Sequence, residues 1–262
     1  GTGVGNNNQT GTVAIGYDAL KVLTTGGQNL AIGYQALKSE DTSDGNVAIG
    51  YQALQTQNAA DNAGNTAIGY VALTNLTTAI GMTAIGYKAG QSVTSGATQT
   101  LIGHQAGKSL TVGRYNTAIG YLALDAAVED SNNVAIGHNA LSAQNGGGSD
   151  GGATDTNNTA VGYNSGLSVT TGVNNVFLGA YTGNALLTGS SNVAIGKNAL
   201  LSITDTNNMT AVGHEAGRNA NHAGAEGGTY VGYQASKDNT SGGHNTSLGY
   251  QALLTNSTSS YN

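Results

Sequence analysis

A short apolar segment recurs along almost the whole chain. Near copies read NVAIGYQAL at 46–54, NTAIGYVAL at 65–73 and NTAIGYLAL at 116–124. In every copy the residue before the glycine is Ile, Val or Leu. The third residue before the glycine is Thr or Val in all copies but one, where it is Leu30, and the residue between these two is usually Ala. Alternation of this kind, with β-branched residues two positions apart, predicts a short β-strand in every copy.

The glycine of this segment marks a regular repeat. Successive motif glycines are 17 residues apart in ten of thirteen intervals, and the other three intervals are longer, at 19, 25 and 19 residues. A coil that must close on itself tolerates an added surface loop but not a shortened perimeter. The fourteen motif glycines are Gly16, Gly33, Gly50, Gly69, Gly86, Gly103, Gly120, Gly137, Gly162, Gly179, Gly196, Gly213, Gly232 and Gly249.

This period predicts an all-β fold, a parallel β-solenoid of about fourteen rungs of 17 residues. A rung is the coil that contains one motif glycine. Residues 1–262 are expected to form a single domain with a long loop insertion at 141–158, where the longest interval falls. The repeat predicts parallel pairing of Ile15 with Ile32 and of Ile32 with Ile49.

The two faces of the strand predict what each one contacts. The Ile and Val face is expected to fill the core of the solenoid. The Ala and Gly face, for example Ala118 with Gly120, is expected to let another copy of the chain approach closely. In the second half of the rung, Leu or Val often precedes Thr, as at Leu23 and Val93, which predicts a second short strand.

At this level of detail a family resemblance is visible. The string Asn-Thr/Val-Ala-Ile-Gly, with a small residue three positions after the glycine, occurs at Asn46–Ala53 and Asn192–Ala199. It resembles the head repeats of YadA-like trimeric autotransporter adhesins and the repeats of phage-type tail-fibre proteins. The Tyr after the glycine and the 17-residue coil favour the tail-fibre side. The resemblance implies a left-handed β-roll, usually trimeric, on a cell or virion surface.

The position after the motif glycine is the main candidate for binding. It holds Tyr nine times and His three times, and Ala180 and Lys197 once each. Stacked rungs are expected to turn this position into a ladder, which either binds sugar rings or packs against a neighbouring strand or chain. The candidate binding residues are Tyr17, Tyr34, Tyr51, Tyr70, Tyr87, His104, Tyr121, His138 and Tyr163.

The other polar residues indicate a structural role more than a catalytic or metal-binding one. Asn lies four residues before the motif glycine in nine copies, and its amides are expected to bond along the solenoid axis. Acidic residues fall mainly in loops and lack the nonapeptide period of calcium-binding rolls. His222 and His244 lie in separate loops. No spacing of acids, nucleophiles or histidines indicates catalysis, so we expect no enzyme, no cofactor and no metal.

Composition and charge limit the classes of partner that the chain can bind. The chain has 42 Gly, no Pro, no Cys and 8% charged residues, with a formal net charge of −6. Eight basic residues are too few to bind a nucleic acid tightly. No apolar run approaches the roughly 18 residues that a membrane span needs, so no membrane insertion is expected.

The function that follows is a non-enzymatic structural and adhesive fibre segment in the extracellular space, on a cell surface or a virion. Its expected partners are copies of itself, as a homotrimer or a filament, and a cell-surface glycan bound at many weak sites. An alternative is an extracellular filament of solenoids stacked end to end, because no capping segment flanks the repeats. A third is an ice-binding protein, because Thr recurs three residues before the glycine, although Val interrupts this row.

Overall fold

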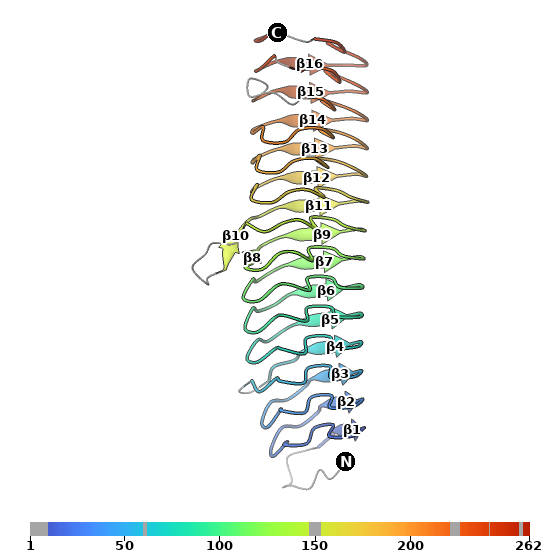
Figure 1. Cartoon of the computed structure of the whole chain (residues 1–262), viewed down its shortest axis with the longest axis vertical. Helices are drawn as coiled ribbons and strands as arrows, with labels where there is room; N and C mark the ends of the chain where they lie inside the picture. The colour runs from blue at the N-terminus through green and yellow to red at the C-terminus, as the bar shows by residue number, and fades with distance from the viewer. Residues whose placement is uncertain (1–9, 60–61, 147–152, 221–225, 241, 257–258) are drawn as a thin grey trace.

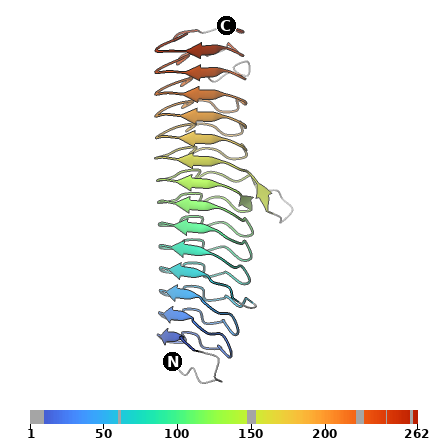
Figure 2. The same cartoon turned by 180° about the vertical axis from the view of Figure 1, so that it is seen from behind.

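The computed structural model describes residues 10–59, 62–146, 153–220, 226–240, 242–256 and 259–262. In these residues the chain forms a parallel β-solenoid without helices. Fourteen strands form one parallel sheet in chain order and lie one above the other along the long axis (Figures 1 and 2). The predicted fold class is therefore confirmed, with about thirteen turns of about 17 residues between the first strand and the last.

Each strand of the main sheet is three residues long and ends just before the motif glycine. The strands are β1 (Val13–Ile15), β2 (Leu30–Ile32), β3 (Val47–Ile49), β4 (Thr66–Ile68), β5 (Thr83–Ile85), β6 (Thr100–Ile102), β7 (Thr117–Ile119), β9 (Val134–Ile136), β11 (Thr159–Val161), β12 (Val176–Leu178), β13 (Val193–Ile195), β14 (Thr210–Val212), β15 (Thr229–Val231) and β16 (Thr246–Leu248). A separate two-stranded sheet consists of β8 (Asp130–Ser131) and β10 (Thr154–Asp155).

The register of the sheet follows the repeat. Ile15 pairs with Ile32, and Ile32 pairs with Ile49, as the spacing predicts. The predicted second strand in each rung is wrong. Around Leu23 and Val93 the described chain forms bends and turns instead of a strand. Val93 is fully buried and Leu23 partly buried, and single hydrogen bonds join successive rungs there, such as Thr94 N–H to the Thr111 carbonyl at 3.0 Å.

The predicted assignment of the strand faces is also wrong, because the small residue faces the core. Ala48 and Ala118 are fully buried, whereas the flanking Thr, Val and Ile side chains are partly exposed. Inside the coil the alanine lies against a Leu that follows the glycine by four residues, such as Leu54, which is also fully buried. The coil is too narrow for a large side chain from both sides, so the strand contributes its smallest one.

The motif glycine is required by the backbone. At Gly50 φ is +139°, which side-chain-bearing residues rarely adopt. A Cβ atom there would lie 2.3 Å from the carbonyl oxygen of Gly69 in the next rung. Close approach between rungs therefore excludes a side chain at this point of the turn.

Buried asparagines form the predicted amide ladder along the axis. The Asn175 backbone N–H and Nδ2 both donate to Asn158 Oδ1, at 2.9 and 3.2 Å. The Asn175 side chain also donates to the Gly189 carbonyl at 3.0 Å, and its own Oδ1 accepts from the Asn192 backbone N–H at 2.9 Å. Each amide thus satisfies backbone groups that would otherwise be buried without partners.

Part of the predicted long insertion, 147–152, lies outside the described residues. The ends of the insertion are anchored in the solenoid. Gln144 and Thr156 are fully buried, and Gln144 Nε2 donates to Asp130 Oδ1 at 3.2 Å. β10 protrudes from the side of the stack, where it pairs with β8, whose two residues are buried (Figure 1).

No helix in the described part of the chain is long and apolar enough to cross a membrane.

Candidate binding surface

All nine predicted binding residues come together in one continuous ladder of rings. From Tyr17 to Tyr163, each ring stacks on the next with centroid separations between 4.9 and 5.5 Å and interplanar angles between 8° and 26°. His104 and His138 take their places in this stack without interrupting it.

The backbone places these rings in line. Each ring follows a motif glycine, and its carbonyl accepts a hydrogen bond from the next rung, as Tyr17 does from the Gln35 N–H at 2.8 Å. The rings are well exposed, with Tyr70 48% and Tyr121 46% accessible. Because each inner ring is covered on both faces by its neighbours, the ladder presents ring edges and hydroxyl groups to solvent. A sugar therefore cannot lie flat on an inner ring and has free ring faces only where the ladder stops.

The ladder is interrupted once between Tyr17 and Tyr250. Ala180 and Lys197 occupy the ring position in two successive rungs. Beside this gap, the Tyr181 ring approaches Tyr163 edge-on, at 5.2 Å and 70°. Beyond the gap, stacking resumes from His214 through Tyr233 to Tyr250, with centroid separations of 5.4 and 5.2 Å.

In every rung, the strand that forms the outer sheet face comes just before the motif glycine and the ring position that follows it. It carries the Thr or Val and the Ile or Val side chains that flank the buried alanine. Most of these are partly exposed, but β12 exposes Leu178 at 47% and Val176 at 38%. Among the other described strands, only the terminal β1 and β16 expose both of their outward residues to this degree. Thr66, Thr83, Thr100 and Thr117 form an unbroken row of four on this face.

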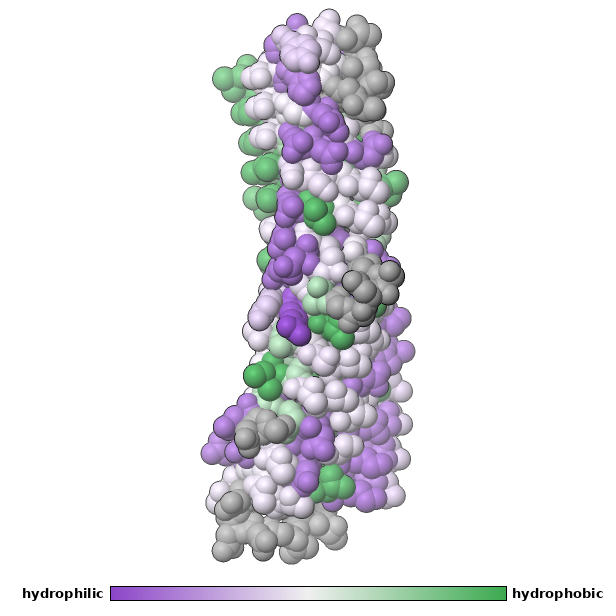
Figure 3. Space-filling view, turned by 90° about the vertical axis from the view of Figure 1, so that its left-hand side faces the viewer, coloured by the Kyte–Doolittle hydropathy of each residue, from purple (hydrophilic) through white to green (hydrophobic). Residues whose placement is uncertain are grey.

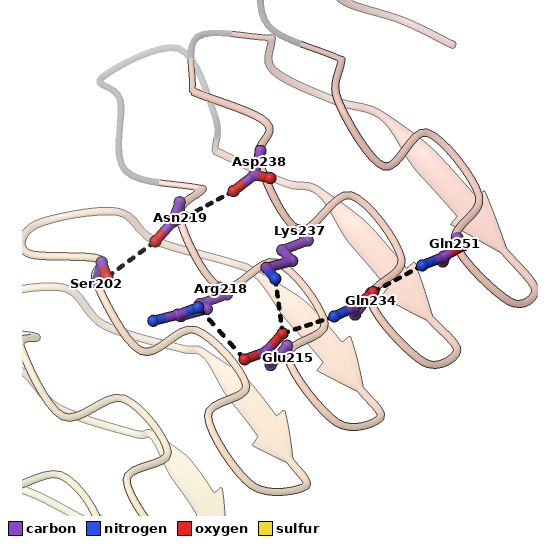
Figure 4. A network of polar contacts seen from close by, with 8 residues as sticks. All are labelled: Ser202, Glu215, Arg218, Asn219, Gln234, Lys237, Asp238 and Gln251. Atoms are coloured by element: carbon purple, nitrogen blue, oxygen red, sulfur yellow. Dashed lines mark hydrogen bonds and ion pairs between the residues drawn. The ribbon is translucent and has the colours of Figure 1, made fainter.

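The residue that follows the ring position is polar in most rungs, and in two of them it is an acid within a charged cluster. Near the C-terminal end, Glu215 contacts Lys237 Nζ at 2.9 Å and Arg218 Nη1 at 3.3 Å, and accepts a hydrogen bond from Gln234 at 2.8 Å (Figure 4). Hydrogen bonds from Lys237 and Gln234, together with nearby positive charge, lower the pKa of Glu215 to about 2. The carboxylate therefore stays ionised and satisfied within its own cluster.

The first rungs contain a similar cluster. Asp18 forms ion pairs with Lys21 at 3.3 Å and with Lys38 at 4.0 Å. As at the other end, the acid lies two residues after a motif glycine, and the two cations lie five residues after the glycines of its own rung and of the next. Neither cluster is predicted above from the sequence, although this spacing across rungs could have revealed both of them.

The face that carries the connecting loops differs from the ladder and the outer sheet face. In Figure 3 it is mostly purple and white, with scattered green residues, and green gathers along one edge of the view. This face therefore offers no extended apolar surface among the residues that the structure describes.

Among the described residues, no group of three or more His, Asp or Glu side chains could hold a metal ion. His244 stacks on Tyr261 at 5.1 Å, and His222 lies outside the described residues. Asp130 is fully buried, and burial raises its pKa although Gly146 and Gln144 donate hydrogen bonds to it.

The chain matches no protein-family model, no curated protein and no solved structure. The fold and the surface geometry therefore carry the functional argument.

Proposed function

We propose that the protein is a non-enzymatic structural and adhesive fibre segment, displayed outside the cell or on a virion. The observation that carries this proposal is the long, straight outer sheet face, whose apolar row continues from rung to rung beside the ring ladder. A rigid rod with the same surface in every rung suits many weak contacts made together, in which avidity exceeds the affinity of each contact.

The outer sheet face provides the contact with further copies of the chain. Ile68, Ile85 and Ile119 point away from the core and remain partly exposed. An apolar row of this length favours association, because contact with another copy removes these side chains from water. We therefore propose self-association through the Ile face instead of the Ala face, since Ala118 is inside the coil. We propose a lateral homotrimer on this face, with the end-to-end filament as the alternative.

Glycans are the proposed external ligands. Ring edges, Tyr hydroxyls and neighbouring amides, such as Gln52 donating to Gln35 at 3.1 Å, form polar columns along the rod. Such columns bond to sugar hydroxyls from the side, whereas ring stacking is confined to the ends and the gap of the ladder.

The test is the mass of the native particle. We expect wild-type protein to form oligomers in sedimentation velocity experiments. Ile85→Lys combined with Ile119→Lys is expected to shift the particle towards monomer, because two charges would be buried in the contact. Ser95→Lys adds a charge at an exposed position in a bend and is the matched control. Circular dichroism checks that the solenoid persists. A wild-type monomer at all concentrations, or oligomers unchanged by the paired substitution, would contradict the proposal.

Two other functions make different predictions in cheap experiments. The row of four outward Thr side chains beside Ile favours an ice-binding surface, and thermal hysteresis measured on wild-type protein tests it. End-to-end stacking into a filament predicts particles of indefinite length in negative-stain microscopy, where lateral association predicts rods of one length.

A further inference from the structure

The gap in the ring ladder is the most distinctive place on the surface. In the other described rungs a ring occupies the position after the glycine, but here Ala180 has only a methyl group and Lys197 follows in the next rung. Ala180 and Lys197 lie in neighbouring rungs, because the Asn198 N–H donates to the Ala180 carbonyl at 3.0 Å. Tyr163 lies in the rung before them, because the Tyr181 N–H donates to the Tyr163 carbonyl at 2.9 Å.

The gap combines apolar surface with aromatic edges. Leu178, two residues before Ala180, is 47% exposed, although its strand lies in the interior of the stack. Tyr181, three residues after Leu178, meets Tyr163 of the preceding rung edge-on, instead of stacking face to face as the earlier rings do. A pyranose ring has one face of C–H groups, which suits an apolar and aromatic surface of this kind.

Lys197 supplies a charge that no acid in the described chain neutralises. Its side chain is exposed, and it forms no ion pair among the described residues. The acid in the adjoining rung, Glu215, is held by Lys237 and Arg218. In a chain with a net charge of −6, an ammonium group of this kind within an aromatic row is suited to a ligand carboxylate.

We propose that this gap, bounded by Tyr163, Leu178, Tyr181 and Lys197, binds a carboxylated pyranose of an acidic polysaccharide. The sugar ring lies over Leu178 and against Tyr181, and its carboxylate accepts a charge-assisted hydrogen bond from Lys197 Nζ. This inference rests on the proposed adhesive function and narrows it to an acidic glycan with one preferred site in each chain.

Binding of a galacturonic acid tetramer to the full chain, measured by calorimetry beside the neutral galactose tetramer, tests the site. We expect the acidic tetramer to bind and the neutral one to bind much more weakly. Lys197→Gln should raise the Kd about tenfold through loss of one charge-assisted contact. Ala180→Tyr should abolish binding, because it restores the residue found at nine equivalent positions and fills the gap.

Lys88→Gln is the matched control, because it removes a cation beside the uninterrupted ladder, where Lys88 Nζ lies 5.3 Å from the Tyr87 ring centroid. It should leave the Kd unchanged. Equal binding of the two tetramers, or wild-type affinity in both Lys197→Gln and Ala180→Tyr, would overturn the inference. A glutamate tetrapeptide that binds as tightly would show that charge alone is recognised, which also overturns it.

Sedimentation of the same variants separates this inference from the proposed function. If oligomers persist and wild-type protein binds neither tetramer, only the acidic-sugar site fails. If the acidic tetramer binds as described and the paired Ile→Lys substitution leaves the particle unchanged, the site holds and the proposed self-association fails.

Discussion

Two regions of the solenoid fill the same narrow core in opposite ways. Around Ala48 and Ala67 the strand contributes a methyl group, and Leu54 from the turn fills the remaining space. At Phe177 the strand contributes an aromatic ring, and the turn positions that would carry Leu are Gly166 and Gly183. A Cβ at Gly183 would lie 2.4 Å from Phe177 Cε1, so the ring and a side chain there are mutually exclusive.

The same exchange occurs at two other places. Leu101 in β6 has Gly90 and Gly107 at the matching turn positions, where a Cβ would lie 2.7 Å from its methyl groups. Tyr230 in β15 is fully buried, and a Cβ at Gly217 would lie 2.6 Å from its ring. The repeat therefore maintains the volume inside each coil, and individual positions vary within that limit.

The largest expected effect is the loss of the ring. Phe177→Ala empties the core of one rung without refilling the glycine positions beside it. We expect a loss of about 3–5 kcal/mol in the free energy of unfolding, measured by chemical denaturation. Ala48→Gly in a regular rung is the control and should cost less, because it removes one methyl group. A loss below about 1 kcal/mol for Phe177→Ala would show that the volume is not maintained.

A double-mutant cycle sharpens the comparison. Gly183→Leu alone should destabilise the protein by about 1–3 kcal/mol through overpacking against Phe177. When Phe177→Ala is present in the same chain, the introduced leucine side chain takes the place of the ring and should recover part of the loss. The backbone permits it, since Leu37 and Leu54 occupy the equivalent position with φ of 52° and 50°. Losses that simply add in the double variant would refute the exchange.

The stability that the amide ladder contributes should not depend on which side chain fills the core. Asn29 lies in a regular rung and Asn175 beside Phe177, and each Oδ1 accepts a backbone N–H from the next rung at 2.9 Å. Asn29→Ala and Asn175→Ala should each cost about 1–3 kcal/mol, because each leaves a buried N–H without its acceptor. Denaturation of the two variants under the same conditions gives the test. A clearly larger cost at one site would show that the ladder and the core are coupled.

The ring ladder should contribute less, and less at its interruption than within it. Tyr70 stacks on two rings, and Tyr163 stacks on one and meets another edge-on. Tyr70→Ala should lower the free energy of unfolding by about 0.5–1.5 kcal/mol for each stacked pair removed. Tyr163→Ala should lower it by less. Thermal unfolding measures both, and an unchanged melting temperature in Tyr70→Ala would show that stacking adds no stability.

The smallest effect concerns the charged cluster at Glu215. Its pKa in the folded protein, about 2, is below the ordinary value of 4.5, so its contribution is present above pH 4.5. It should be lost as the pH falls from 4.5 through 2. Glu215→Gln should therefore be less stable than wild type at pH 6 and approach it at pH 2. A stability difference that does not change with pH would argue against this ionised cluster.

The motif glycines alone are sufficient to predict the solenoid and its parallel register. A 17-residue interval that varies only by insertion has few structural solutions, and a glycine with φ of +139° is visible in the sequence as an invariant of the repeat. The amide ladder and the ring ladder could also be predicted, because identical residues in identical rungs must lie in columns along the axis.

The strand faces could not be assigned from the alternating pattern. Alternation states that Ala and Ile lie on opposite sides, but it does not state which side faces the core, and hydrophobicity favours the wrong one. The exchange between Phe177 and its glycines was visible in the sequence only as an irregularity of the repeat. The exchange can be recognised only when the turn is known to lie across the core from the strand.

What the sequence determines by itself is the period, because a repeated string imposes the same local conformation on every rung. What the tertiary structure decides is the contents of the narrow core and of the surface: which side chains fit inside one coil, which remain outside, and where the ring ladder has open faces. The reason is that volume and exposure depend on contacts between the two sides of the coil and between rungs, and a linear pattern contains neither.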